Sequence, residues 1–165
     1  MDWKRFWRHV VMTPAAARRA FPESTLEAIQ RAVAEQEKRH RGEIRFVVEA
    51  ELTTAQLRAG LTSRRRAAVL FGQLNVWDTA ERTGVLVYVM LADRNVEILA
   101  DRGISAVIEP ATWQAICDDM AGAFREGRFE AGSIQGIEAI AARLAQHFPA
   151  TGDNTNELPD RPVML

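Results

Sequence analysis

The sequence predicts one α/β domain, in which a mixed, mostly parallel sheet with an antiparallel hairpin strand is sandwiched between helices. Stretches with helical periodicity alternate with two apolar stretches of strand length, residues 43–50 and 84–91. A helical pattern separates these two strands, which implies a right-handed parallel crossover. Turn residues then lead the chain back into residues 96–100, which adds the antiparallel neighbour.

The composition is that of a single globular domain. The chain has 165 residues, of which 47% are hydrophobic and 26% charged, enough to bury one core. Its formal net charge of −1 creates no general field for anions, so no nucleic-acid partner is expected. No apolar run approaches the length of a spanning helix, so we expect a cytoplasmic location, at most peripheral to the inner membrane.

Residues 1–20 are expected to form a basic amphipathic extension, with a helix that ends before Pro14. Aromatic and aliphatic side chains recur there at helical spacing, and basic side chains fill the other side. This helix either covers an exposed part of the core or lies on an anionic membrane surface or in the groove of a partner protein. The candidate contact residues are Trp3, Phe6, Trp7, Lys4, Arg5 and Arg8.

The domain proper, residues 21–148, is expected to begin with a helix opened by a capping box at Ser24 and Glu27 and ended by Gly42. After the first strand, Thr53 or Thr54 caps a helix that runs to about residue 74. Its run of arginines, residues 64–66, is interpreted as a solvated face rather than an anion site.

The strand at 84–91 is apolar throughout, as expected for a central strand covered on both faces. After the returning strand, Pro110 and Thr112 open a helix that Gly127 closes, and a last helix reaches Phe148. Cys117, the only cysteine, falls in an apolar pattern and is interpreted as a buried, inert thiol. Residues 149–165 lack periodicity and are predicted to be a disordered tail.

The predicted topology gathers charged residues at two poles of the sheet. The starts of the first two strands and the end of the third share one pole, and the other holds Glu49, Glu51, Asp93 and Arg94. At the first pole, carboxylates could bind calcium, which prefers several oxygen ligands, and arginines could hold an anion. The candidate metal ligands are Asp78, Asp101 and Glu43, and the candidate anion-binding residues are Arg82 and Arg102. The same residues could equally form only charge pairs and turn caps.

Residues 78–89, the pair Asp93-Arg94 and residues 97–104 resemble the centre of TPM domains, whose pattern runs from "NGVL" through an apolar strand and "DR" to a glycine turn. Residues 124–132 and 40–44 are similar to two further segments of that family. The resemblance implies a mixed α/β sandwich. In this family some members are weak acid phosphatases, some bind calcium, and others are accessory factors of membrane protein assemblies.

The sequence departs from the family pattern at two places. Thr83 stands where most members have Asn, and residues 101–104 replace a "GxGLE" turn of exported members. The transmembrane helix and glycine-rich tail of many members are also missing. The resemblance therefore implies a cytosolic type of bacterial member, related to the acid-phosphatase-like proteins of the thylakoid lumen.

Two hypotheses of function follow. The first is an accessory or binding domain, with at most weak activity, that acts near the inner membrane face through its first helix and also binds a cation. The alternative is a weak metal-assisted phosphatase in which Asp78 and Asp101 hold a divalent cation and Arg82 or Arg102 holds the phosphate. No motif in the sequence identifies a catalytic residue.

Overall fold

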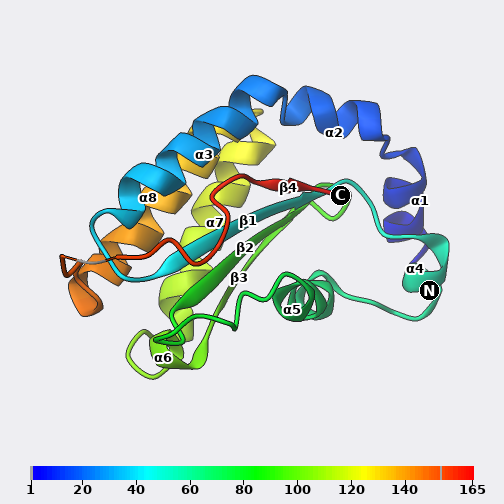
Figure 1. Cartoon of the computed structure of the whole chain (residues 1–165). Coiled ribbons are helices and arrows are strands. Elements are labelled where there is room, and N and C mark those ends of the chain that lie inside the picture. The colour runs from blue at the N-terminus through cyan, green and yellow to red at the C-terminus, as the bar shows by residue number, and fades with distance from the viewer. Residues whose placement is uncertain (1, 153) are drawn as a thin grey trace.

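The computed structural model, which describes residues 2–152 and 154–165, has a four-stranded sheet in the order β3-β2-β1-β4 (Figure 1). β1 (Glu43–Glu49) pairs in parallel with β2 (Gly84–Met90). β3 (Asn95–Ala100) returns antiparallel to β2, and β4 (Val163–Met164) is parallel to β1. The predicted mixed sheet with an antiparallel hairpin strand is confirmed.

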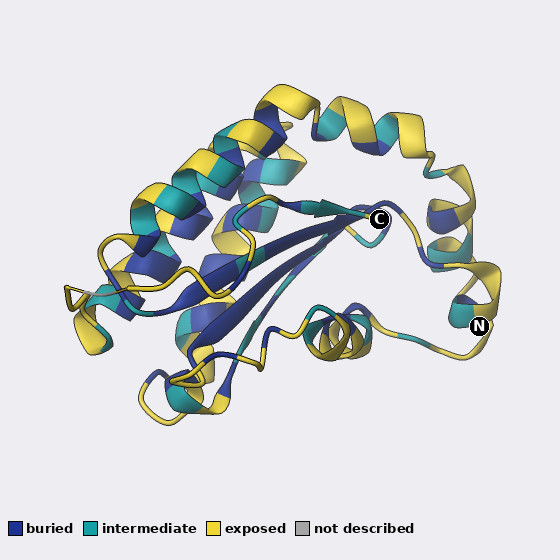
Figure 2. Cartoon of the chain, in the orientation of Figure 1, coloured by how far each residue is buried: buried dark blue, intermediate teal, exposed yellow. Residues whose placement is uncertain are grey.

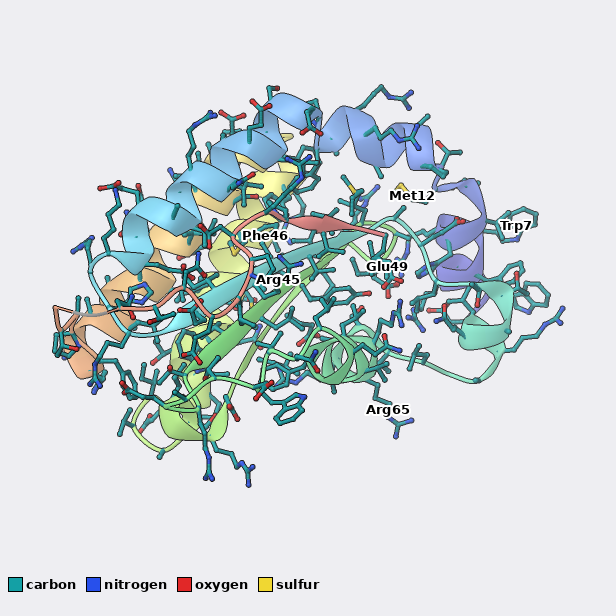
Figure 3. All side chains as sticks on the ribbon, in the orientation of Figure 1. Trp7, Met12, Arg45, Phe46, Glu49 and Arg65 are labelled. Carbon is teal, nitrogen blue, oxygen red and sulfur yellow. The ribbon has the colours of Figure 1, made fainter. Side chains whose placement is uncertain are left out.

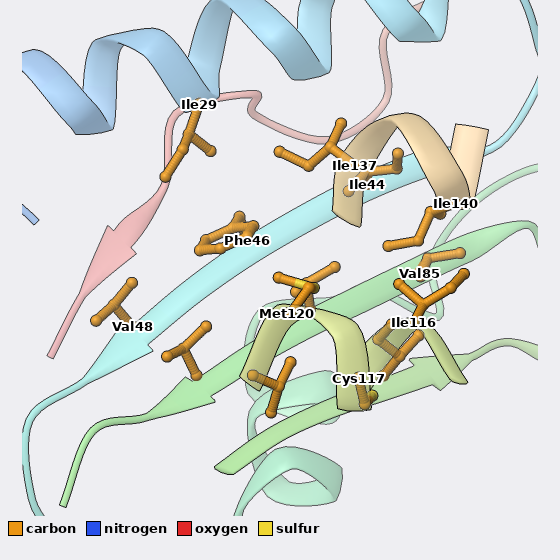
Figure 4. Close-up of a cluster of buried hydrophobic side chains, with 14 of the residues drawn as sticks. Ile29, Ile44, Phe46, Val48, Val85, Ile116, Cys117, Met120, Ile137 and Ile140 are labelled. Atoms are coloured by element: carbon orange, nitrogen blue, oxygen red, sulfur yellow. The ribbon is translucent and has the colours of Figure 1, made fainter. Parts of the chain in front are cut away.

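One face of the sheet is covered by three long helices, α3 (Glu23–Glu37), α7 (Pro110–Arg125) and α8 (Phe129–His147) (Figure 1). Their buried side chains meet those of alternate strand residues, as Figure 4 shows for Ile29, Phe46 and Ile137. Cys117 lies in this cluster, and burial raises the pKa of its thiol to about 12. The thiol is therefore protonated at neutral pH, and the prediction that it is buried is confirmed.

The other face is covered by α5 (Ser63–Gln73), which follows the short helix α4 (Thr54–Arg58). The prediction of one helix from Thr53 to residue 74 was wrong. Gly60 adopts a left-handed conformation with φ of 69° between them, and Thr62 caps the second helix. The capping box of α4 is formed by Thr53 and Gln56.

The capping box predicted at Ser24 and Glu27 is also wrong. Pro22 occupies the N-cap of α3, which leaves Ser24 inside the first turn, beyond the position of a cap. The neighbouring Thr25 hydroxyl instead donates to Glu130 of α8, at 2.8 Å.

The N-terminal extension forms two helices, α1 (Trp3–Val11) and α2 (Pro14–Ala20), and the first ends before Pro14 as expected. The side chains of Asp2 and Thr13 cap them. Both helices lie beyond the carboxyl ends of β1 and β2 (Figure 1). A single-turn helix, α6 (Arg102–Ser105), follows β3 at the opposite pole.

The prediction that residues 149–165 are a disordered tail was wrong for the described part of that segment. The tail runs along the open edge of β1, where the Leu165 amide donates to the Val48 carbonyl at 2.8 Å. Leu158 is buried in the cluster on the α5 face of the sheet. Most of the tail around it is exposed (Figure 2). An unpaired strand edge binds backbone whatever its side chains, so a polar composition does not reveal this pairing.

Candidate functional site

The first pole does not bring the three predicted metal ligands together. Glu43 pairs with Gly84, while the Asp101 amide donates to the Gly84 carbonyl at 2.9 Å. Glu43 and Asp101 therefore lie two strand spacings apart, about 10 Å across the sheet. Asp78 is exposed in the loop before β2. Within residues 2–152 and 154–165, no three His, Cys, Asp or Glu side chains are grouped so as to hold a metal ion.

Asp101 caps α6, because its Oδ1 accepts from the Arg102 amide at 2.7 Å. Its second oxygen, Oδ2, is buried without a hydrogen-bond partner among the described residues. Arg82, with φ of 57°, and Arg102 are both exposed. The backbone carbonyl of Arg82 accepts from the Gly103 amide at 3.0 Å, so this predicted anion-binding residue is fixed by its turn.

Glu43 belongs to a different arrangement, in which buried carboxyl groups attach both the tail and α3 to β1. Its Oε2 accepts from the Leu158 amide at 3.0 Å, and Glu37 Oε1 accepts from the Ile44 amide at 2.7 Å. Burial raises the pKa of Glu43 to about 7. Burial, and then the neighbouring Glu43, raise the pKa of Glu37 to about 9. The sequence prediction missed Glu37, although its position four residues after Val33, on the buried line of this helix, was an available signal.

At the opposite pole, Asp93 in the β2–β3 turn connects three elements. Arg5 of α1 donates to both of its oxygens at 2.9 and 2.8 Å, His9 lies 3.0 Å away, and the Ser63 hydroxyl donates at 3.0 Å. Burial alone would raise the pKa of Asp93, but the hydrogen bonds from Arg5, His9 and Ser63 outweigh it and lower the pKa to about 2. The sequence analysis placed Asp93 at this pole, but it did not predict that Arg5, His9 and Ser63 bind it. The spacing of Arg5 and His9, four residues apart on one side of a helix, was the available signal.

His9 is held as the neutral tautomer with its proton on Nε2. Its Nδ1 accepts from the Leu52 amide at 2.9 Å, so Nε2 must be the nitrogen that donates to Asp93. His9 is buried, and α1 is thereby attached both to the turn after β2 and to the chain after β1.

A second buried ion pair lies beside this one. Arg66 of α5 donates to both oxygens of Glu49, and the Tyr88 hydroxyl donates to the same carboxylate. The neighbouring Arg64 and Arg65 are exposed, so the interpretation of this run as a solvated face holds for those two and fails for Arg66.

The outward side of α1 leaves apolar side chains in solvent. Trp3 is 62% exposed and Trp7 58% exposed, and Val10 and Val11 extend the same surface (Figure 3 labels Trp7). Of the other predicted contact residues, Lys4 and Arg8 are exposed, while Phe6 packs partly against the core and Arg5 binds Asp93. We call the four exposed residues Trp3, Trp7, Val10 and Val11 the outer face of α1.

A model of the TPM domain family matches residues 17–143. The chain belongs to the TPM domain family. Among solved structures, this TPM domain is similar to the NMR structure of the BA42 protein from the psychrophilic bacterium Bizionia argentinensis, with 30% sequence identity and a TM-score of 0.76. The similarity covers 86% of this chain and 93% of the BA42 chain. No curated protein matched the chain.

The residues of this TPM domain that carry the family pattern have packing roles at the first pole. A Cβ on Gly84 would lie 1.9 Å from the Val76 carbonyl oxygen, so the strand start admits no side chain there. Thr83 donates through its hydroxyl to the Arg41 carbonyl at 3.0 Å.

α1 lies before residues 17–143, which the model of the TPM domain family matches. None of the helices in the described part of the chain has the length and apolar character that crossing a bilayer demands.

Proposed function

We propose that this TPM domain is an accessory binding domain that attaches to an anionic membrane surface through the outer face of α1. The observation that carries the proposal is the exposure of two tryptophans, Trp3 and Trp7, on one side of a helix whose other side is fixed to the domain. Exposed tryptophan is costly in water and favourable at the level of lipid headgroups.

The charges around the outer face suit an anionic surface. Residues 2–20 contain five Lys and Arg but only one acid, Asp2, although the whole chain is close to neutral. Lys4 and Arg8 are exposed next to the tryptophans. Apolar side chains flanked by basic ones are the pattern of helices that lie in the plane of the membrane interface.

The attachment of α1 supports the proposal, because a fixed helix presents its outer face without first having to fold. Asp93, mostly buried and ionised, binds Arg5, and His9 bridges Asp93 to Leu52. A surface that is already ordered loses less conformational entropy when it binds.

Co-sedimentation with vesicles tests the proposal. We expect the full chain to pellet with phosphatidylglycerol vesicles and much less with phosphatidylcholine vesicles or at high salt, since charge contributes to binding. Replacing both Trp3 and Trp7 by Ser should weaken partitioning about tenfold or more, because each change removes apolar area from the interface.

Trp77→Ser is the matched control. Trp77 is 54% exposed but lies before β2, at the pole opposite α1. It should leave pelleting unchanged. Equal pelleting of the wild-type chain and the Trp3/Trp7 double variant would overturn the proposal, as would absence of binding to any anionic vesicle, which would favour a protein partner for this surface.

Cation binding at the first pole is a second candidate, and the specific observation that favours it is the unpartnered Oδ2 atom of Asp101. A buried carboxylate oxygen without a donor is costly, and a cation would offset that cost. A metal there would also be the starting point for the phosphatase alternative, with the exposed Arg82 and Arg102 available to an anion.

A further inference from the structure

A cleft of about 780 Å³ lies at the carboxyl end of β2, where it is lined by residues of α2, the β2–β3 turn and the end of α7. Open α/β sheets bind their ligands beyond the carboxyl ends of parallel strands. The volume is within the range of sites that enclose small molecules. The cleft is distinct from the outer face of α1, whose residues do not line it.

Apolar side chains form much of the lining. Phe124 and Phe129 stack on each other with ring centroids 5.4 Å apart, and Met12 enters from the link between α1 and α2. Figure 3 shows Met12 beneath α2, on the side of that helix that faces the sheet. The cleft therefore offers a surface on which an apolar group can be buried.

Three arginines from three elements line the same cleft: Arg19 of α2, Arg94 of the β2–β3 turn and Arg125 at the end of α7. No Asp or Glu is among the lining residues. Within the described residues, none of these guanidinium groups has a carboxylate within 4.0 Å. Arg5 and Arg66, by contrast, are each bound to a buried carboxylate.

Arg94 is held in an unfavourable backbone conformation. Its φ is 53°, in the left-handed region that favours glycine, and its amide closes the turn on the Leu91 carbonyl at 3.0 Å. Glycine or asparagine would occupy this turn position at lower cost. The turn therefore does not require an arginine at this position, but the arginine adds a positive charge to the cleft.

We propose that this cleft binds a small organic anion with an apolar body, in which a carboxylate or phosphate head contacts the arginines and the apolar part lies on Phe124 and Phe129. Guanidinium groups pair with both kinds of head through paired N–H donors. Because the chain as a whole carries a formal charge of −1, attraction for the anion comes from this local cluster. The inference is independent of attachment to membranes, since it requires no lipid surface.

Calorimetric titration of the full chain in solution tests the inference, with decanoate and decyl phosphate as the probes. We expect at least one of the two probes to bind. The probe that binds more tightly shows whether the site prefers a carboxylate or a phosphate head group. Inorganic phosphate should bind far more weakly, because it cannot use the phenylalanines. Decyltrimethylammonium should not bind, because its charge has the wrong sign.

Variants of the arginines locate the site. Arg19→Gln, Arg125→Gln and Arg94→Gly should each weaken binding about tenfold or more, as expected for loss of a charged hydrogen bond. Arg94→Gly also relieves the backbone strain at φ of 53°, so its melting temperature should not fall and a loss of binding cannot be attributed to unfolding. Arg18→Gln is the matched control, since Arg18 is the exposed neighbour on α2 that does not line the cleft.

Three results would overturn the inference. The first is that neither decyl anion binds. The second is that decyltrimethylammonium binds as tightly as the anions. The third is that Arg18→Gln and Arg19→Gln lose affinity equally. Tight binding of inorganic phosphate alone would also contradict it, because the apolar lining would then have no role. None of these results depends on whether the chain binds vesicles.

Discussion

Glu37 alone is expected to change how the unfolding free energy of the whole chain depends on pH. Its folded-state pKa lies at about 9, against an ordinary value of 4.5, because burial and the neighbouring Glu43 disfavour its charge. The folded chain therefore binds more protons than the unfolded chain between these values. Stability is fully present below the unfolded pKa and falls as pH rises through this window, by up to about 1.4 kcal/mol per pH unit.

We expect Glu37→Gln to remove most of this slope between about pH 7 and about pH 9, where Glu43, with a pKa of about 7, has already titrated. Urea unfolding at several pH values measures it. Glu35→Gln, an exposed change on the same helix, should keep the wild-type slope. If the variant and the wild type lose stability in parallel over this interval, Glu37 is not the buried acid.

Single residues were the least predictable part of this chain. Glu43, Asp93 and Asp101 were placed at the correct poles, because strand direction determines the pole at which each strand end lies. Their partners were not predicted. Glu43 accepts from Leu158 and Asp93 binds Arg5 and His9, and these contacts join segments more than 80 residues apart in sequence.

At the scale of elements, α1 depends on one carboxylate. Asp93 is mostly buried and binds Arg5 through two hydrogen bonds, with His9 and Ser63 completing its contacts. A charged, buried pair of this kind is costly to break from one side, because the remaining charge loses its partner.

Asp93→Asn should therefore release α1 while the sheet persists. We expect faster amide exchange in residues 3–11 and a loss of about 2 kcal/mol in unfolding free energy. Hydrogen exchange followed by mass spectrometry shows which residues exchange faster and by how much. Glu97→Gln, which removes the carboxylate of the more exposed pair with Arg64, should leave α1 protected. Unchanged exchange in α1 would mean that apolar contacts hold it.

The helices and strands themselves followed from local patterns, with instructive exceptions. The three β segments and the helices of the α3–α7–α8 layer were predicted from periodicity. The break between α4 and α5 was missed because the apolar spacing continues across Gly60, whose left-handed conformation interrupts the helix. The start of α3 was misplaced because Pro22 occupies the cap position ahead of Ser24.

At the scale of the whole molecule, a ligand that binds only the folded state raises its stability by mass action. If a divalent cation occupies the first pole, millimolar calcium should raise the melting midpoint above that in excess chelator. The motivating feature is Asp101, whose Oδ2 atom is buried without a partner among the described residues.

Asp101→Asn should abolish that calcium shift, because an amide retains an oxygen that can cap Arg102 but loses the charge that attracts the cation. Asp78→Asn tests whether the exposed carboxylate takes part. Identical midpoints of the wild-type chain with calcium and with chelator would rule out the cation site and, with it, the metal-assisted phosphatase.

The sequence by itself determined the α/β class, the parallel crossover with its antiparallel hairpin, the family, and the two poles at which charged residues collect. These follow from local periodicity, strand direction and family motifs. Only the tertiary structure decided that the polar tail pairs with the edge of β1, that Asp93 fixes α1, and that Arg19, Arg94 and Arg125 meet at one cleft. Each of these contacts depends on which distant segments become neighbours when the chain folds. Composition and periodicity indicate which side chains of a segment can be buried, but they do not indicate which other segment covers them.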